Sequence, residues 1–353
     1  MSQKPGFQLL VVGGRQRKRA LDLDEWHAYD RGVIVAIDPE TGSSRTVVEY
    51  QTPAEFCADR DPSIVFKAGD LRQEAGRIIV CTQTEILEYD LDLWKPTYFF
   101  SHPGFNDLHH VCYQEDLAEN REEHLLVANT GLDQVLRIQL DRSEPANSRV
   151  VQEWSTCDRE TWSRFDRTVD YRKVPTTKPH LSHPNFVFQT QGNRYATRFH
   201  QQDALNLDHP DKRIDVPGGN PHDGIVSGDQ VAFTTTNGHI VFCNRTTGQS
   251  VRSYDLTKMS GTIGSDSGEL GWCRGICLEG PARAWVGFSR IRPTWLRKNL
   301  SWIKQGFQAR GQYGTQPTRV ALYDLEKSET LVEIDLEASG LNAVFGIYRW
   351  QTG

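Results

Sequence analysis

Histidine residues recur at the start of apolar, strand-like segments of this sequence. Five of the 11 His lie in FNDLHHV (105–111), KPHLSHPNF (178–186) and GNPHDG (219–224). Neutral imidazoles joined by a carboxylate bind zinc, iron or manganese, and three ligands leave a coordination position open for water or substrate. We therefore predict a divalent metal site at His110, His183 and His222. The alternative is that these histidines cap strand ends or hydrogen-bond within their own sheets.

Strand alternation leaves open whether His109 or His110 faces the same space as the other histidines. Asp223, or a spare histidine such as His109, is the predicted general base. Guanidinium donors suit carboxylate or phosphate oxygens, so a small anionic ligand is expected. The arginines predicted to stabilise negative charge are Arg198, Arg274 and Arg290, and the further substrate contacts are Asn129, Thr130, Lys178, Asn185 and His200. A structural role is the alternative for each arginine.

A repeated pair of strand patterns must position these residues. An apolar strand precedes each of six runs that alternate and end in a polar turn: GVIVAIDPETG (32–42), TEILEYDLD (84–92), DQVLRIQLD (133–141), DALNLDHPD (203–211), GHIVFCNRTTG (238–248) and RVALYDLEKSE (319–329). This period predicts an all-β fold, a six-bladed β-propeller with four-stranded blades, as a single domain over residues 1–353. A β-sandwich or two smaller β domains is the alternative.

The first unit lacks an inner strand of its own. Inner strands of the other units are expected at 63–69, 108–114, 185–191, 223–228 and 274–280. The last apolar segment, NAVFGIYRW (342–350), has the same pattern and no partners nearby in the sequence. We predict that it completes the blade begun by residues 7–50, because closure removes the open sheet edges that promote aggregation.

The long loops all fall on one face of the predicted propeller, at 15–31, 51–62, 156–182, 257–271 and 290–318. Functional residues concentrate on loops held by a rigid scaffold, so the site is expected on this face. Within the last loop, apolar residues recur at helical spacing over residues 292–311, which predicts an amphipathic helical insertion. This insertion would pack on the rim, cover the channel, or contact a protein partner or a second copy.

Composition narrows the function classes. The net charge of -6 and the pI near 6.0 give no positive field for nucleic acid, which is therefore not expected as a partner. No apolar run approaches the length of a membrane span, and the run at residues 7–12 is too short for a signal-peptide core. The seven cysteines lack CxxC spacing. We expect a cytoplasmic protein with reduced thiols.

The six units together resemble the six-bladed propeller superfamily that includes gluconolactonase-like, NHL-repeat and strictosidine-synthase-like proteins. The stretch RGICLEGPARAWVGFSRIR (274–292) is similar to a motif of uncharacterised bacterial propeller proteins, and it covers the last unit. Gluconolactonase-like enzymes hold calcium with acidic and amide side chains, whereas histidines occupy those entrances here. Peptidyl-amide lyases of the NHL type use three channel histidines on zinc, an arrangement that His110, His183 and His222 can match.

We therefore expect a metal-dependent hydrolase or lyase that acts on a small anionic substrate at the mouth of the channel. The metal is expected to be zinc, iron or manganese rather than calcium. The alternative is a non-catalytic propeller that binds a protein partner or a metabolite through its long-loop face.

Overall fold

The computed structural model describes residues 6–17, 29–60, 62–114, 123–261, 270–290 and 316–351. These residues form β-strands and short 3-10 helices, which confirms the predicted all-β class. The strands are β1 Phe7–Gln16, β2 Tyr29–Ile37, β3 Ser44–Tyr50, β4 Lys67–Arg72, β5 Arg77–Cys81, β6 Ile86–Asp90, β7 Pro96–Phe100, β8 Leu108–Gln114, β9 His124–Asn129, β10 Gln134–Gln139, β11 Arg149–Ser155, β12 Pro184–Thr190, β13 Asn193–Arg198, β14 Asp203–Asn206, β15 Arg213–Asp215, β16 Pro221–Ser227, β17 Gln230–Thr235, β18 His239–Asn244, β19 Ser250–Asp255, β20 Trp272–Leu278, β21 Arg283–Ser289, β22 Arg319–Asp324, β23 Glu329–Asp335 and β24 Ala343–Gln351. The 3-10 helices are η3 Ala54–Phe56, η4 Thr130–Leu132, η5 Pro145–Asn147, η6 Thr161–Ser163, η7 Tyr171–Lys173, η8 Leu256–Lys258 and η10 Glu337–Ser339.

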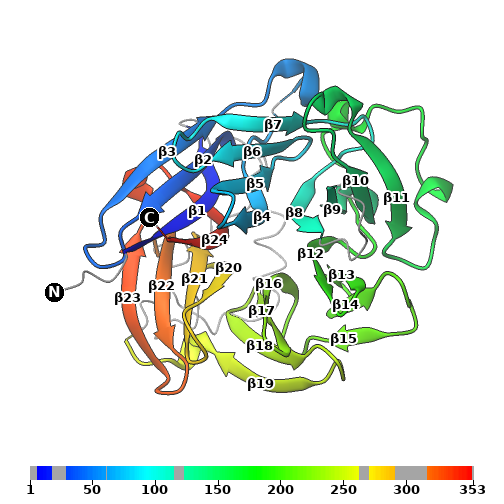
Figure 1. Cartoon of the computed structure of the whole chain (residues 1–353). Coiled ribbons are helices and arrows are strands. Elements are labelled where there is room, and N and C mark those ends of the chain that lie inside the picture. The colour runs from blue at the N-terminus through cyan, green and yellow to red at the C-terminus, as the bar shows by residue number, and fades with distance from the viewer. Residues whose placement is uncertain are drawn as a thin grey trace, which may run out of the picture.

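The sheets are arranged around a common centre, as in a propeller (Figure 1). In the described part of the chain, four sheets have four strands each: β24-β1-β2-β3, β12-β13-β14-β15, β16-β17-β18-β19 and β20-β21-β22-β23. A further sheet has eight strands in the order β11-β10-β9-β8-β4-β5-β6-β7. One parallel pairing, Ala68 with His110, joins its two halves. Strands β4, β8, β12, β16, β20 and β24 lie innermost, so their starts meet near the axis (Figure 1).

The last strand closes the fold onto the first. Strand β24 pairs antiparallel with β1, from Phe7 opposite Gln351 to Gly14 opposite Ala343, which confirms the predicted closure. Gly13 permits this approach, because a Cβ at that position would lie 1.7 Å from the Ala343 carbonyl oxygen.

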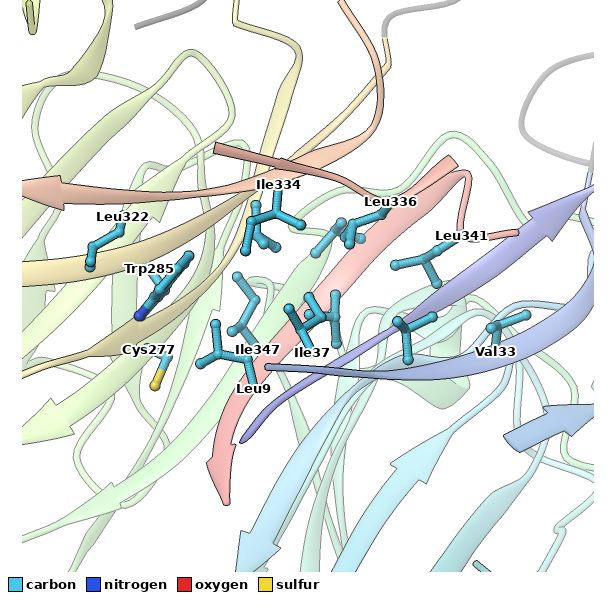
Figure 2. Packing of buried hydrophobic residues seen from close by; sticks show 14 residues of the cluster. Leu9, Val33, Ile37, Cys277, Trp285, Leu322, Ile334, Leu336, Leu341 and Ile347 are labelled. Atoms are coloured by element: carbon cyan, nitrogen blue, oxygen red, sulfur yellow. The ribbon is translucent and has the colours of Figure 1, made fainter. Parts of the chain in front are cut away.

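A buried apolar cluster reinforces the closure. Trp285 and Leu322, from the β20–β23 sheet, face Leu9, Ile37 and other side chains of the β24-β1-β2-β3 sheet (Figure 2). Burial of such large side chains stabilises the contact by about 1.5–3 kcal/mol each. The interface between the first and the last sheet is thus a core rather than a surface contact.

Some predicted boundaries differ from the observed ones. The inner strand expected at 63–69 begins instead at Lys67, because the buried residues before it form no regular ladder with a neighbouring strand. The helical insertion expected at 292–311 lies outside the described residues. All seven cysteines are free thiols. In the described residues, no helix has both the length and the apolar character needed to cross a membrane.

Candidate functional site

Three histidines from three different sheet segments meet at the centre of the molecule. The centroid of the His109 ring lies 5.0 Å from that of His183 and 5.9 Å from that of His222. His109 belongs to β8, His183 directly precedes β12 and His222 belongs to β16. The fold therefore brings together residues that are far apart in the sequence, and we call His109, His183 and His222 the histidine cluster.

His109, and not His110, belongs to this cluster. The His110 ring packs 4.7 Å from the Phe186 ring, and its Nδ1 accepts a long hydrogen bond of 3.4 Å from the Val187 N–H. Burial lowers the pKa of His110 to about 4. The register of β8 against β9 shifts between Leu108 and His110, so His109 is outside the regular ladder, and it faces the other histidines while His110 packs against β12.

Each imidazole of the histidine cluster has its Nδ1 engaged by a neighbouring group. His109 donates from Nδ1 to the Asp107 carbonyl oxygen at 2.9 Å, and His222 donates to the Asp223 carboxylate at 2.9 Å. His183 Nδ1 lies 2.6 Å from His180 Nδ1. In His109 and His222 the Nε2 lone pair is therefore left for another partner.

The cluster fits the donor set of a divalent metal. The Nε2 atom of His222 is buried without a hydrogen-bond partner, as expected for a nitrogen that lacks its ligand. Burial lowers the pKa of all three imidazoles, and the Lys67 ammonium lowers that of His109 further. Neutral imidazole is the form that binds metals. Among the described residues, however, no group of three or more His, Cys, Asp or Glu is already spaced as a metal-binding set.

Backbone strain accompanies the cluster. Asp107, Asp133 and His183 have φ angles of 48°, 49° and 55°, in the left-handed region that residues other than glycine rarely adopt. Such conformations persist only where the surrounding structure imposes them, and they concentrate at functional sites. His183 belongs to the histidine cluster, and Asp107 and Asp133 each form a hydrogen bond with a residue of the cluster.

The three predicted arginines have different surroundings. Arg198 forms a buried ion pair with Asp203 at 2.5 Å, and Arg290 pairs with Glu337 at 2.6 Å, so both guanidinium groups brace the fold. Arg274 is buried, and its guanidinium carbon lies 4.5 Å from the centroid of the Phe345 ring. In the described structure Arg274 alone of these three forms no ion pair, although the nearby Asp223 and Asp107 carboxylates oppose the lowering of its pKa by burial.

Asp223, the predicted general base, is held in place by its neighbours. Asp223 Oδ2 accepts hydrogen bonds from His222 and from the Gly275 N–H at 2.7 Å, an arrangement that orients the imidazole. Burial would raise the pKa of Asp223, but His222, Gly275 and Arg274 together lower it. Asp223 is thus a weak base held in place.

The remaining predicted contacts lie at different depths. Asn129 donates to the Gly104 carbonyl and Thr130 to the Pro184 carbonyl, so both fasten loops. Asn185 is buried, donates to the Pro221 carbonyl and leaves its Oδ1 without a partner. His200 is exposed, with its ring 6.2 Å from that of His183, and Lys178 is also exposed.

Two residues of the site were not among the predicted contacts. Lys67 Nζ lies 4.3 Å from the centroid of the Phe345 ring and 3.7 Å from Asp107. Burial lowers the pKa of Lys67 to about 8. The signal for Lys67 was a lysine inside the apolar run SIVFKAG, where a cation is costly unless it has a role. Phe345 carried no such signal, because an aromatic residue in a strand is ordinary.

Comparisons with known proteins support the fold. No family model and no curated protein matches the chain. A chain in the crystal structure of a nidogen/laminin complex is similar with a TM-score of 0.54 and 12% identity, covering 97% of this chain and 98% of that chain. Weaker similarities are to a chain of a mitotic checkpoint complex (TM-score 0.43, 9% identity, 86% and 74% covered) and to a computationally designed protein (TM-score 0.39, 6% identity, 85% and 70% covered).

The similarity to the nidogen/laminin structure extends over nearly the whole of both chains. At such low identity it concerns the fold alone. Together with the arrangement of the sheets, it identifies the chain as a β-propeller protein.

Proposed function

We propose that the protein is a metal-dependent hydrolase or lyase that acts on a small anionic molecule at the centre of the propeller. The supporting observation is that the three imidazoles of the histidine cluster meet with every Nδ1 engaged. Outer partners of this kind fix ring orientation in metal sites. The site would be framed by six blades, counting the eight-stranded sheet as two, since one residue pairing joins its halves.

In this proposal His109, His183 and His222 bind zinc, iron or manganese through Nε2. A bound divalent metal would lower the pKa of a water ligand and polarise a carbonyl oxygen. Asp223, the Asp107 carbonyl and His180 orient the three imidazoles. His180 or the exposed His200 serves as general base at the edge of the cluster. The arrangement resembles the three-histidine zinc site of peptidyl-amide lyases in ligand type.

Elemental analysis of protein purified without affinity tag or chelator, and then titrated with zinc, manganese and iron, tests this proposal. We expect one metal ion per chain in the wild type and in His110→Ala, whose ring lies outside the cluster. His109→Ala and His183→Ala should lose it. Asp223→Asn should bind the metal roughly 10- to 100-fold more weakly, because His222 loses its orienting carboxylate.

Circular dichroism of each variant separates loss of a ligand from loss of the fold. The proposal is wrong if the wild type binds none of these metals stoichiometrically. It is equally wrong if His109→Ala and His183→Ala, while folded, keep the wild-type affinity.

A non-catalytic binding protein is the second candidate. It is favoured by the lack of a preset metal-binding group in the described residues. The similar chain belongs to the crystal structure of a nidogen/laminin complex. This candidate predicts that metal-free and metal-treated protein bind the same ligand equally well.

A further inference from the structure

Two buried cations contact a single aromatic ring next to the histidine cluster. Lys67 Nζ lies 4.3 Å from the centroid of the Phe345 ring, and Arg274 Cζ lies 4.5 Å from the same centroid. The two cations are therefore close neighbours. The same ring lies 6.3 Å from that of His222. Lys67 is 6% exposed and Arg274 8% exposed, which means that water solvates neither charge well.

Neither cation has a carboxylate at hydrogen-bond distance in the described residues, although Asp107 lies near enough to act electrostatically on both, and Asp223 on Arg274. Arg274 has no acidic side chain within ion-pair distance in the described residues, and its Nε is buried without a hydrogen-bond partner. Lys67 faces Asp107, but the 3.7 Å separation exceeds that of a hydrogen bond. A buried donor without a hydrogen-bond partner is costly, so the unpaired Arg274 Nε, beside an ammonium that is also too far from Asp107 for a hydrogen bond, indicates a ligand that supplies an acceptor.

We propose that Lys67, Arg274 and the face of Phe345 form a subsite for the carboxylate group of a small organic acid. The planar guanidinium binds the two carboxylate oxygens, the ammonium adds a third donor, and the ring contacts the apolar carbon next to the carboxylate. The subsite deepens the proposed function, because it defines the anionic substrate as a carboxylate held beside the histidine cluster.

The charge balance favours a carboxylate over a phosphate. With the imidazoles neutral, the Asp107 and Asp223 carboxylates already balance Lys67 and Arg274, so a ligand adds its whole negative charge to this buried site, and a smaller charge is less costly to bury. A carboxylate carries one negative charge, whereas a phosphate monoester carries about 1.5 to 2 at neutral pH.

Access is available from the side of Asp107. The Asp107 side chain is 20% exposed, and it lines a small cavity together with Thr84, Asn106 and Arg172.

Calorimetric titration and thermal unfolding with propionate test the subsite. Propionamide has the same shape without the charge, and inorganic phosphate tests the competing anion. We expect propionate to bind and raise the melting temperature, whereas propionamide should do neither and phosphate should bind more weakly than propionate. In Arg274→Met, propionate affinity should fall roughly 10- to 100-fold, the range expected for losing charged hydrogen bonds.

The melting temperature of the ligand-free variants distinguishes a ligand-binding role of Arg274 from a structural role. Arg274→Met removes a buried donor that has no hydrogen-bond partner at Nε and no ion pair, so the ligand-free melting temperature should change less than in Lys67→Met. Lys67→Met should also weaken propionate binding but should lower the melting temperature, because Asp107 then loses its counter-charge. The control Arg290→Gln, at an arginine paired with Glu337, should keep wild-type propionate binding.

Both metal-free and metal-loaded protein should be titrated, so that the two proposals can fail separately. If no metal binds but propionate binds with dependence on Arg274, the carboxylate subsite is supported and the metal enzyme is wrong. If metal binds while propionate does not, the subsite alone is wrong. Equal binding of propionate and propionamide, tighter binding of phosphate, or unchanged propionate affinity in Arg274→Met would each overturn it.

Discussion

Asp133 fixes the backbone that presents His183. Its buried carboxylate accepts hydrogen bonds from the N–H groups of Leu181, Ser182 and His183 at 2.8 to 2.9 Å, and from Arg164 at 2.9 Å. Burial would raise the pKa of Asp133, but these donors outweigh it and lower the pKa. His183 can therefore keep its left-handed conformation, and its ring stays beside that of His109.

We predict that Asp133→Asn lowers metal affinity roughly 10- to 100-fold, although Asp133 does not touch the proposed metal position. The amide nitrogen would face backbone donors, so the free energy of unfolding should fall by roughly 3 kcal/mol as well. Metal titration and urea unfolding measure the two effects. The control is Asp141→Asn, an exposed carboxylate that also accepts from two backbone N–H groups. Loss of stability with unchanged metal affinity would show that Asp133 has no positioning role.

At the residue scale, sequence predicted which residue types meet near the axis better than it predicted their orientation. It placed histidines at the centre, but it could not choose between His109 and His110, because both occupy a strand whose two faces are buried. It also treated Arg198, Arg274 and Arg290 alike. Their roles depend on distant partners, Asp203 and Glu337 for two of them, and residue type does not encode such partners.

Two buried glutamates at and just before strand β6 have pKa values shifted in opposite directions. Glu88, in β6, accepts from Arg142 at 2.9 Å and also from Tyr113. Burial would raise its pKa, but these bonds lower it. Glu85, just before β6, has only hydroxyl donors, from Tyr50 and two threonines, so burial prevails and its pKa is raised.

The two glutamates should affect stability with opposite dependence on pH. A lowered folded pKa contributes stability above the unfolded pKa of about 4.3, and this is lost as pH falls through the folded value. Glu88→Gln should therefore lower the free energy of unfolding by roughly 2 to 3 kcal/mol at neutral pH, with a smaller effect in acid. A raised folded pKa favours the protonated folded state, so Glu85 loses its contribution as pH rises from about 4.3.

The stability of Glu85→Gln relative to wild type should accordingly improve as pH rises from about 4.3 through the folded value. Denaturant unfolding of both variants between acid and neutral pH measures the two trends. Parallel curves for wild type and both variants would contradict the assigned ionisation states.

At the element scale, the alternation of apolar and polar residues was enough to place most strands. The predicted 108–114 segment coincides with β8, and 342–350 is within one residue of β24. The strand predicted at 63–69 begins only at Lys67. The buried loop residues before Lys67 are as apolar as strand residues, and only hydrogen-bond partners in other segments distinguish a loop of this kind from a strand.

At the scale of the whole molecule, the motif at 274–292 acquires a physical role in closure. A Cβ at Gly287 would lie 2.4 Å from Val344, so glycine allows β24 to approach β21. The Ser289 hydroxyl accepts a hydrogen bond from the Val344 N–H at 2.9 Å. The Gly275 N–H binds Asp223, which orients His222. The motif therefore links the last sheet both to the closing strand and to the candidate site.

Because β24 closes the fold onto β1, we predict that the chain tolerates new termini in the segment between β23 and β24. Phe7 lies opposite Gln351, so joining Gly353 to Met1 connects β24 to β1 as a hairpin, and opening the chain between Gly340 and Leu341 leaves every strand intact. Because all ladder hydrogen bonds and the apolar cluster of Figure 2 are retained, this permutant should fold with a melting temperature close to that of wild type.

A chain truncated after Gly340 is the matched comparison, since it differs by lacking β24. Truncation exposes the edge of β1 and removes Val344 and Ile347 from the core, so we expect aggregation or a strongly reduced melting temperature. Size-exclusion chromatography and thermal unfolding of both proteins measure the difference. A truncated protein with the same oligomeric state and melting temperature as wild type would show that β24 does not close the fold, and the centre that gathers the histidines would then lack its structural basis.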